Sequence, residues 1–405
     1  MKIGILREEK IPQDNRVPLT PSQCRTLMEE HSNVWIAVQP SRHRCYTDDE
    51  YRNHGIILRE DLSDCDLLLG VKEVPPELLL PGKTYLFFSH TVKKQPHNRR
   101  LLQEVLRKRV RLIDWECLKD ENGKRLIAFG RWAGIVGAYN GIRAYGLRLQ
   151  GAHHFELRPM YQCLNFAEAQ KEFAKVNLPP VKIVLTGTGR VSNGAAFLLD
   201  LLHIPKVSPA DFLQREFDRC VYTQLASADM YYKEGQTEFD SAHYHAHPEE
   251  YKSLFTPYTR VATVFINGIY WDQRIPVFFT AEDMKRPDFR IEVIADITCD
   301  IAPNSSVPST IRPSTITDPV YGYDPQTGKE CPPFQPGCVD VMAIDNLPNE
   351  LPRDASEDFG NMVLSRIIWR LLKNDTATLH HATIALEGRL NEPYAYLHDY
   401  VYQEA

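Results

Sequence analysis

The sequence predicts an α/β fold with two mainly parallel sheets, each covered by helices. Three observations lead to this prediction. The chain has 405 residues, whereas a single domain usually holds about 100 to 200. Apolar residues make up 43% and charged residues 25%, as in ordinary globular proteins. Short β-rich runs alternate with helical segments in both halves of the chain, which is typical of a parallel sheet covered by helices.

The first half carries one such series. Its β-rich runs are KIGIL (2–6), NVWIAV (33–38), CDLLLGV (65–71) and TYLFF (84–88). Helical segments lie between and after them at 22–31, 47–55 and 97–110. In the last of these, apolar residues recur at helical spacing and the basic residues fall largely on the other side, which indicates a solvated face rather than a nucleic-acid surface.

The second half carries a similar series. Residues 129–151 are small and apolar through several turns, which predicts a long buried helix whose glycines allow close packing. β-rich runs follow at 182–186, 261–268, 289–298 and 339–345, with a helix at 193–202 and a Pro/Ser-rich loop at 302–315. The segment 355–374 predicts a C-terminal helix with Ser356 or Asp354 near its cap and apolar residues spaced by four.

Charge and cysteine content exclude several classes of function. Lys plus Arg is 47 and Asp plus Glu is 53, so the net charge of −6 offers no general attraction to nucleic acid or to an anionic membrane. The nine cysteines are scattered without a C-x-x-C motif, which favours buried thiols in a reducing compartment. No apolar run approaches the length of a membrane span, and the N-terminal run is too short for a signal peptide. We therefore expect a cytoplasmic protein.

The strongest single motif is the glycine turn in VKIVLTGTGRVSNGAA. A β-branched run ends in Gly187-Thr188-Gly189, and an Ala/Leu-rich helix follows. Glycines at such a turn let the backbone approach a pyrophosphate at the helix N-terminus. The third small position is Ser192, so the motif is imperfect. A tight turn without a ligand is the alternative, but the strand–turn–helix context favours a dinucleotide.

Three polar residues of the first half lie at or near predicted strand ends, where open α/β sheets place their ligands. Lys72 follows LLLGV, His90 follows TYLFFS, and Arg16 lies in the loop NRVPLTP. A lysine with a lowered pKa and a histidine could serve as acid and base. Each residue alone is more often structural, so only their joint placement indicates a site.

Two further candidates come from different halves. Arg125 and Asp300 lie next to predicted strands, and Arg125 with Arg16 would suit a substrate with several carboxylates. His243, His245 and His247 could place three imidazoles on one side of an extended strand and bind a metal. The loop-like surroundings and the lack of a positioned carboxylate argue against this, so we expect no metal.

Segments along nearly the whole chain resemble a known superfamily. They include REEKIPQDNRVPLTP, GVKEVP, KTYLFFSHTVKKQ, GKRLIAFGRWAGIVG, VLTGTGRVSNGA, FINGIYWDQ and MAIDNLPNELPRDASEDFG. The sequence resembles the alanine dehydrogenase and lysine-forming saccharopine dehydrogenase superfamily, most closely the lysine-ketoglutarate reductase half of bifunctional aminoadipic semialdehyde synthase. No second catalytic unit is apparent.

The resemblance implies two Rossmann-like, doubly wound domains with an active-site cleft between them. Residues 1–140 plus 350–405 would form the substrate domain, and 141–349 the NAD(P)-binding domain. Lys72 and His90 look like the catalytic acid–base pair. The implied substrate-binding residues are Arg16, Gln95, Arg125, Phe129 and Asp300. The implied cofactor-binding residues are Gly189, Arg190, Val191, Tyr270, Ile344, Asp345 and Leu347, besides Gly187 of the turn.

Cofactor preference follows from the next predicted strand. An NAD site usually places Asp or Glu about 20 residues past the turn to bind the ribose 2′-hydroxyl. Here Ser208 takes that place, with Lys206 and Arg190 nearby. Asp211 is the alternative residue that could bind the ribose 2′-hydroxyl. The sequence therefore favours NADP over NAD. The segment 211–258 is longer than a βαβ crossover needs. Its extra residues could form a substrate-specific loop.

The expected function is NAD(P)-dependent condensation of L-lysine with 2-oxoglutarate to saccharopine, or the reverse reaction. One alternative is an alanine dehydrogenase-type oxidoreductase, which has little use for Arg125. Another is a non-catalytic NAD(P)-binding sensor. The expected partners are small molecules, namely L-lysine, 2-oxoglutarate and saccharopine, without nucleic acid or membrane. A homo-oligomer is left open.

Overall fold

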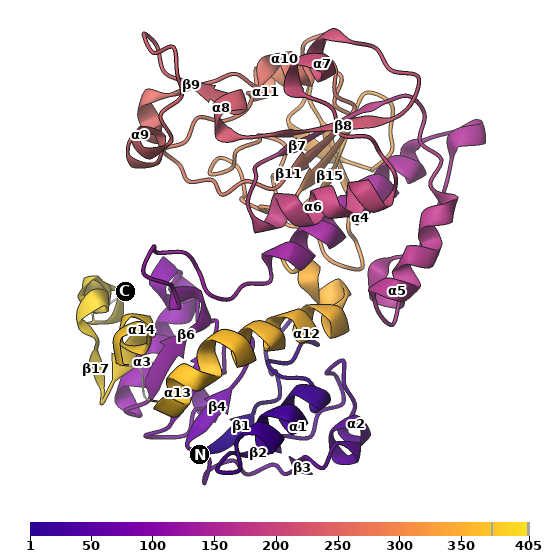
Figure 1. The fold of residues 1–405 in the computed structure, drawn as a ribbon. Coiled ribbons are helices and arrows are strands. Elements are labelled where there is room, and N and C mark those ends of the chain that lie inside the picture. The colour runs from indigo at the N-terminus through magenta and orange to yellow at the C-terminus, as the bar shows by residue number, and fades with distance from the viewer. Residues whose placement is uncertain (374–375, 403–405) are drawn as a thin grey trace. The chain divides into compact units, whose positions relative to one another are not determined.

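The computed structural model describes residues 1–373 and 376–402, and the chain divides into two compact units. Unit 1 is Met1–Phe129 with Pro352–Ala405, and unit 2 is Gly130–Leu351 (Figure 1). The boundary expected at 140 would fall inside helix α4 (Gly130–Arg148), all of which belongs to unit 2. Helix α4 lies in unit 2 because it packs along α6 (Arg190–Leu201) and against strands of the unit 2 sheet.

Unit 1 is built on an eight-stranded sheet with the order β17-β16-β6-β5-β4-β1-β2-β3. β1 to β6 run parallel, and β16 and β17 add an antiparallel edge. The strands are β1 (Lys2–Ile5), β2 (Trp35–Val38), β3 (Ile57–Leu58), β4 (Leu67–Leu69), β5 (Thr84–Phe87), β6 (Arg111–Asp114), β16 (Thr383–Leu386) and β17 (Arg389–Leu390). The runs predicted as strands in this half thus form one sheet.

The helices of unit 1 cover both faces of this sheet, and each face has its own apolar core. They are α1 (Pro21–Glu30), α2 (Asp48–Asn53), α3 (Arg99–Arg107), α12 (Pro352–Val363), α13 (Trp369–Lys373), α14 (Thr376–Ala382) and α15 (His398–Tyr402). Capping boxes at Thr20 and Thr47 begin α1 and α2.

The C-terminal helix begins earlier than the sequence predicts. It starts at Pro352, so Ser356 lies inside the helix, fully buried, and its Oγ accepts a hydrogen bond from the Val17 N–H at 2.9 Å. Of the two residues expected near the cap, Asp354 lies in the first turn of the helix, whereas Ser356 lies beyond it. The predicted apolar spacing is confirmed, since Phe359, Val363 and Ile367 are all buried in the core against the sheet. The predicted end at Asn374 lies outside the described residues.

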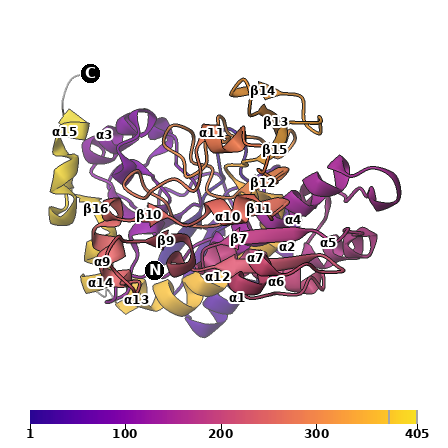
Figure 2. The ribbon, with the colours of Figure 1, turned by 90° about the horizontal axis from the view of Figure 1, so that it is seen from above.

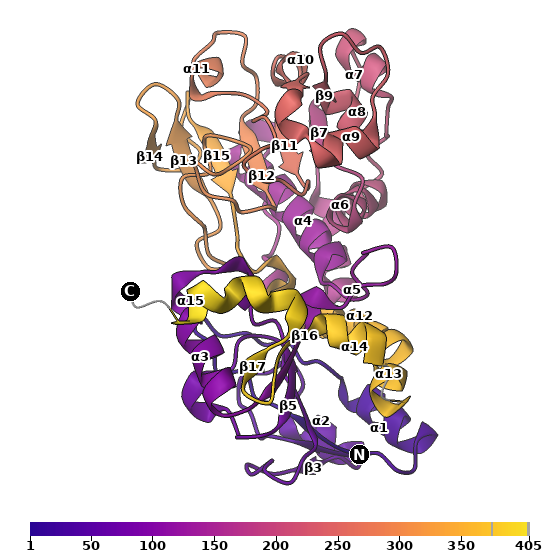
Figure 3. The ribbon, with the colours of Figure 1, turned by 90° about the vertical axis from the view of Figure 1, so that its left-hand side faces the viewer.

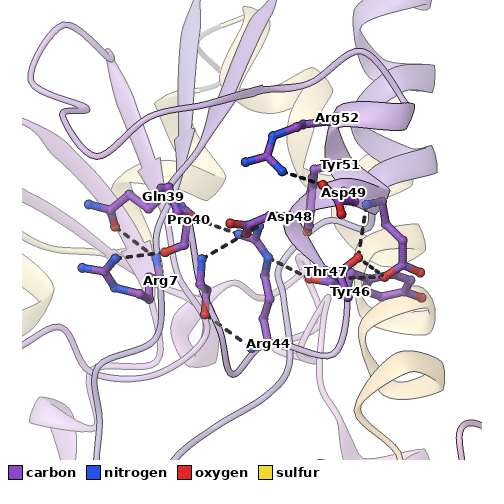
Figure 4. Close-up of polar contacts among 12 residues, drawn as sticks. Arg7, Gln39, Pro40, Arg44, Tyr46, Thr47, Asp48, Asp49, Tyr51 and Arg52 are labelled. Atoms are coloured by element: carbon purple, nitrogen blue, oxygen red, sulfur yellow. Dashed lines mark hydrogen bonds and ion pairs between the residues drawn. The ribbon is translucent and has the colours of Figure 1, made fainter.

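The connection from β2 to α2 is held by Arg44 (Figure 4). Its guanidinium donates to the Gln39 carbonyl at 2.7 Å, to the Tyr46 carbonyl at 2.8 Å and to the Asp48 carboxylate. This loop is fixed to β1 because the Arg7 N–H donates to the Gln39 side chain at 3.0 Å. The residues after β1 consequently have a defined path.

Unit 2 is built on a seven-stranded sheet with the order β14-β13-β15-β12-β11-β7-β8 (Figure 3). β8, β7, β11, β12 and β15 run parallel, and β13 and β14 form an antiparallel edge. The strands are β7 (Lys182–Thr186), β8 (Val221–Leu225), β11 (Val264–Asn267), β12 (Val293–Asp296), β13 (Tyr321–Asp324), β14 (Lys329–Cys331) and β15 (Val339–Met342).

Helices α4 and α6 pack closely along one another in unit 2. A Cβ on Gly134 would lie 1.8 Å from the Val191 carbonyl oxygen, and a Cβ on Gly194 would lie 2.1 Å from that of Arg131. The buried helix predicted over 129–151 is confirmed. Its glycines serve close helix packing, as the sequence indicated.

The segment 211–258 contains strand β8, which the sequence reading missed. Further along it lie α8 (Ser227–Met230), α9 (Ser241–Ala246), α10 (Thr256–Thr259), and a small antiparallel sheet of β9 (Tyr231–Tyr232) and β10 (Lys252–Ser253). Its aromatic side chains belong to the core of unit 2, including Tyr231, Tyr244, Tyr251 and Phe255. The other helices of unit 2 are α5 (Phe166–Ala169), α7 (Pro209–Gln214) and α11 (Ala281–Met284).

The predicted α/β class with two mainly parallel sheets is confirmed. Among the described residues, no helix combines the length and the apolarity that crossing a membrane requires.

Candidate functional site

The polar residues of unit 1 gather at the carboxyl ends of its parallel strands. The chain segments after β1, β4, β5 and β6 carry Glu8 and Arg16, Lys72 and Glu73, His90, and Glu116 respectively. Because these strands are parallel neighbours, their carboxyl ends form one edge of the sheet. The sequence reading placed Lys72, His90 and Arg16 there but did not single out the three glutamates.

Lys72 is held through its backbone by Glu8. The carboxylate of Glu8 accepts the Val71 N–H at 2.6 Å and the Lys72 N–H at 2.8 Å. Burial, followed by the charge of Arg16, lowers the pKa of Lys72 below its usual 10.5. A lysine with a lowered pKa is more often neutral and can accept a proton.

Burial and the nearby Asp14 carboxylate raise the pKa of Glu8 to about 8, against the effect of the two N–H donors. Glu8 and Lys72 line a cavity of about 310 Å³ in unit 1, together with Glu73 and residues 74, 75 and 77–80.

His90 is fixed by a carboxylate. Its Nδ1 lies 2.6 Å from Glu73 Oε1, while Glu73 Oε2 accepts from Lys10 Nζ at 2.7 Å. Burial by itself would raise the pKa of Glu73, but the hydrogen bond and charge of His90, with Lys10, lower it to about 2. Glu73 therefore remains a carboxylate and orients the imidazole, leaving Nε2 as the ring nitrogen on the opposite side.

The backbone around His90 is also fixed. His90 has φ of 53°, in the left-handed region. The preceding Ser89 is buried, and its N–H and hydroxyl both donate to Asp114 Oδ2, at 2.8 and 2.5 Å. Asp114 ends β6 and is itself buried. The turn that presents His90 is thus tied to the neighbouring strand.

Arg16 is buried against a carboxylate and an aromatic ring. It makes a bidentate pair with Asp14, at 2.9 and 2.6 Å, and its guanidinium lies 4.1 Å from the centre of the Phe129 ring. Phe129 in turn stacks on Phe359, with ring centres 4.4 Å apart. The structure therefore brings the predicted substrate residues Arg16 and Phe129 together within unit 1.

Arg125 lies in a second environment. It contacts the Glu116 carboxylate, and Lys93 Nζ lies 3.7 Å from the same oxygen. Burial would raise the pKa of Glu116, but Lys93, Arg125 and His90 lower it. Arg125 lines a cavity of about 720 Å³ in unit 1, with Lys93, Glu116 and Lys119 among its other residues.

Gln95 is exposed, and its backbone carbonyl accepts the Tyr400 hydroxyl at 2.6 Å. It does not line the cavity that holds Arg125.

In unit 2 the glycine turn connects β7 to α6. Gly187 has φ of 91°, which favours glycine, and its N–H donates to the Leu225 carbonyl at 2.8 Å. A Cβ added to Gly189 would meet nothing within 4 Å, and no side chain caps α6. The turn is therefore open where a phosphate would approach the helix N-terminus, and its residues fit a dinucleotide.

The predicted position of Ser208 is wrong. The strand beside β7 is β8, and the segment at Ser208 forms only an isolated bridge, Lys206 with Tyr222. Ser208 is the N-cap of α7, where its Oγ accepts the Asp211 N–H at 3.1 Å and donates to the Asp211 carboxylate at 2.9 Å. Ser208 and Asp211 are therefore engaged in capping a helix.

Gln224 of β8 lies beside the glycine turn. It lies near the carboxyl end of β8, and its amide donates to the Gly187 carbonyl at 3.0 Å while Lys206 Nζ donates to its Oε1 at 2.8 Å. The sequence reading missed it because it did not identify β8. The β-branched run VYTQL followed by ASAD could have revealed this strand.

The other predicted cofactor residues lie at the same edge of the unit 2 sheet. Tyr270 follows β11 and is 84% exposed, and Ile344, Asp345 and Leu347 follow β15. Arg190 and Val191 begin α6, and Asp300 follows β12.

A buried polar network also lies along this edge. Asn267 connects Thr186 at 2.9 Å to Asp296 at 3.0 Å. Burial raises the pKa of Asp296. Such a network fixes the strand ends that carry the predicted cofactor residues.

The three histidines after Asp240 do not lie on an extended strand, the arrangement that a metal site on one side of a strand would need. They lie on helix α9 and at its end, which places His243 and His247 together with ring centres 5.1 Å apart, while His245 turns to Ser241. His247, Glu249 and Glu250 have ligand atoms within 4.8 Å of one another, so carboxylates are near after all. The Lys233 ammonium lies between His243, at 3.3 Å, and Glu250, at 2.5 Å.

Comparisons with known proteins agree with this architecture. Residues 4–136 match the family model "Alanine dehydrogenase/PNT, N-terminal domain". A solved structure of L-alanine dehydrogenase aligns over 97% of both chains with a TM-score of 0.64 and 19% identity, which supports the fold.

The sequence relatives are more similar. Alpha-aminoadipic semialdehyde synthase of Arabidopsis thaliana is 33% identical over 98% of this chain and 41% of that protein. Its mouse counterpart is 32% identical over 98% and 47%. The chain thus spans less than half the length of these synthases. Saccharopine dehydrogenase [NAD(+), L-lysine-forming] of Emericella nidulans is 26% identical over 90% of both proteins. Along nearly its whole length the chain is therefore similar to members of the alanine dehydrogenase and lysine-forming saccharopine dehydrogenase superfamily.

Proposed function

We propose that this chain is an NAD(P)-dependent oxidoreductase that forms or cleaves saccharopine from L-lysine and 2-oxoglutarate. The observation that carries the proposal is that Lys72 and His90 follow the neighbouring strands β4 and β5, each held by its own glutamate. The fungal relatives aligned over nine tenths of both chains are named for lysine-forming saccharopine dehydrogenase.

In the synthetic direction an amine must attack a ketone, and the resulting carbinolamine must lose water to give an imine. The first step needs a base to remove a proton from the lysine ammonium. Lys72 suits this role because burial lowers its pKa, so its amine is available at lower pH than that of an ordinary lysine.

The loss of water needs an acid. His90 suits this role because the Glu73 carboxylate, 2.6 Å from Nδ1, orients the ring and its Nε2. A bound nicotinamide would supply the hydride that reduces the imine. Water is the leaving group, so a proton delivered to the hydroxyl is the contribution of the protein at this step.

The carboxylates of the substrates need cations. Arg125, Lys93 and Lys119 line the cavity of about 720 Å³. Arg16 is already paired with Asp14. We therefore assign it two roles, packing against the Phe129 ring and helping to lower the pKa of Lys72 by its charge. Arg125 is also paired, with Glu116, but its side chain is 45% exposed against 3% for Arg16. It is therefore the better candidate to bind a substrate carboxylate, which a guanidinium can do through two parallel hydrogen bonds.

The cofactor site would include Gly187, Gly189, Arg190 and Gln224 of unit 2. No acidic side chain takes the place of Gln224, and Lys206 lies beside it. This absence of repulsion supports NADPH as a cofactor at least as good as NADH, although the fungal relatives carry NAD(+) in their names.

The test is initial-rate oxidation of NADPH and of NADH with paired substrates. We expect turnover only with 2-oxoglutarate and a primary amino acid together, with L-lysine the best amine. Equal turnover with pyruvate and ammonia would replace the proposal by alanine dehydrogenase activity. Cofactor binding without turnover of any pair would favour a sensor.

A further inference from the structure

Strands β13, β14 and β15 lie at the antiparallel edge of the unit 2 sheet (Figure 2). Cys331 and Cys338 are brought together at this edge. Cys331 ends β14 and Cys338 directly precedes β15. The central strand β13 pairs with both, because Gly322 is opposite Cys331 on one side and Asp340 on the other. The strand register therefore places Cys331 opposite Gly322 on one side, and Cys338 two residues before the partner of Gly322 on the other side.

Gly322 provides the space that the sulfur atoms need. A Cβ at this position would lie 2.7 Å from Cys331 Sγ and 2.5 Å from the Pro332 carbonyl oxygen. The Cys331 side chain thus lies over β13 rather than pointing away from it. Its Sγ is 2.6 Å from that of Cys338, the one sulfur–sulfur contact among the described residues.

The loop between them is folded back and anchored. Phe334 and Gly337 have φ of 64° and 81°, in the left-handed region, which reverses the chain between the two cysteines. The Phe334 N–H donates to Asp340 Oδ1 at 2.6 Å, and Asp340 pairs with Arg148 at 2.8 Å. The backbone therefore holds the two thiols near each other, independently of any bond between them.

We propose that Cys331 and Cys338 are a dithiol modification site that a small-molecule disulfide oxidises reversibly to an intramolecular disulfide. The sequence reading treated all nine cysteines as buried single thiols, whereas these two are half-buried and share a contact. Partial exposure allows a reagent to reach the pair. Because the two thiols are already aligned, the intramolecular disulfide is favoured over a stable mixed disulfide with the reagent.

The exchange is balanced in atoms and electrons. Cys338 loses its proton, and its sulfur attacks one sulfur of the reagent, releasing the first thiol and leaving a mixed disulfide. Cys331 then loses its proton and attacks Cys338 Sγ, which breaks the mixed disulfide and releases the second thiol. The two cysteines lose two electrons and two protons, and the reagent gains both. Cys331 acts second because burial and Cys338 raise its pKa to about 12.

The disulfide would fasten β14 to the start of β15. The carboxyl end of β15 leads to Ile344, Asp345 and Leu347, which belong to the proposed cofactor contacts. The proposal itself does not rest on the proposed enzymatic function, because it concerns only the thiols of unit 2.

The experiment uses the reduced full-length protein treated with oxidised glutathione and then with N-ethylmaleimide. Trypsin cleaves after Lys329 and Arg353 and leaves both cysteines on one peptide. We expect this peptide to lose both alkylation sites without gaining glutathione, and to regain both after dithiothreitol. In urea at the same glutathione ratio the intramolecular disulfide should become scarcer, because unfolding removes the alignment.

Variants separate the pair from other thiols. Cys331→Ser should leave Cys338 as a stable glutathione adduct. Cys299→Ser is the matched control and should respond like wild type, because its thiol donates to the Ala343 carbonyl rather than to another sulfur. Wild-type peptide that keeps two reactive thiols, or that forms only glutathione adducts or cross-links between chains, would overturn the proposal. This result is read on the wild-type protein, so it does not depend on how the variants fold.

Discussion

At the scale of single residues, Lys72 and His90 have different supports. Glu8 binds the backbone at Lys72 and leaves the ammonium without an ion pair among the described residues, whereas Glu73 binds the His90 ring directly. Burial therefore lowers the pKa of the lysine through loss of solvation, while the Glu73 carboxylate holds the histidine ring by a hydrogen bond. This contrast is what a proton acceptor and a proton donor need.

Lys72→Met should lower kcat by about 10² to 10⁴, the usual contribution of one positioned proton-transfer group. The side chain is similar in length, so the fold should be retained. Cofactor affinity, measured by NADPH fluorescence, should stay near wild type because Lys72 belongs to unit 1. An unchanged kcat would assign the base to another residue.

Glu73→Gln should reduce the pH dependence of stability. The pKa of Glu73 is lowered to about 2, so its ionised form stabilises the folded state above its ordinary pKa and loses that effect as the pH falls toward 2. The difference in unfolding free energy between wild type and variant should be largest above about pH 5, up to about 3 kcal/mol, and should vanish near pH 2.

Urea unfolding from pH 2 to 7 measures this difference. Glu77→Gln serves as the control because Glu77 is an exposed carboxylate in the same region. A constant difference between wild type and Glu73→Gln across this range would show that the carboxylate has no stabilising charge interaction.

Gln224→Glu should shift cofactor preference toward NADH. A carboxylate beside Gly187 would repel a 2′-phosphate and accept a hydrogen bond from a 2′-hydroxyl. We expect the ratio of kcat/KM for NADPH over NADH to fall by about tenfold, equivalent to about 1.4 kcal/mol.

The matched control for this variant is Ser208→Asp, which should leave the ratio unchanged because aspartate also caps α7. A shift with Ser208→Asp and none with Gln224→Glu would place the ribose at the site that the sequence reading expected.

At the scale of elements, the glycines of unit 2 serve two different purposes. Gly134 and Gly194 lie where α4 and α6 cross, and a methyl group there would collide with backbone. Gly189 has φ of −79°, which any residue can adopt, and faces open space. The first two are therefore required for packing, whereas the structure by itself gives no reason for the third.

Gly189→Ala should fold with near wild-type thermal stability and bind NADPH more weakly, because the added methyl group occupies the space that a pyrophosphate needs. Gly134→Ala should instead destabilise the protein by about 1 to 3 kcal/mol or more through overpacking. Thermal unfolding and NADPH fluorescence on both variants distinguish the two effects. Normal cofactor affinity in Gly189→Ala would mean that the turn has no ligand.

At the scale of the whole molecule, unit 2 is one continuous stretch inserted into unit 1. Each unit has its own sheet and its own apolar core. A compact unit of this size with a separate core generally folds alone. Unit 1 needs both of its segments, since α12 buries Phe359 and Val363 in the core of the N-terminal strands.

Residues 130–351 expressed alone should therefore unfold cooperatively and bind NADPH. The fragment 141–349 is the matched comparison, and it should be unstable because it removes the first half of α4 and with it the contact between Gly134 and α6. Circular dichroism and NADPH fluorescence measure both properties. A fragment 130–351 that does not fold would show that its core depends on unit 1.

The sequence by itself determined what depends on neighbouring residues. Hydrophobic runs identified the two strands that precede Lys72 and His90. The succession of a β-branched run, two glycines and an Ala/Leu-rich helix identified the turn at Gly187. These patterns arise from backbone geometry over a few residues, so they can be read locally.

Only the tertiary structure decided which distant side chains meet. Glu73 bonds to His90, Gln224 lies beside Gly187, and Cys331 contacts Cys338, because sheet order and strand register bring separate segments together. The misplaced Ser208 has the same cause: a linear count from the turn cannot reveal that β8, further along the chain, is the strand that pairs with β7. Strand pairing is decided by long-range packing rather than by sequence spacing.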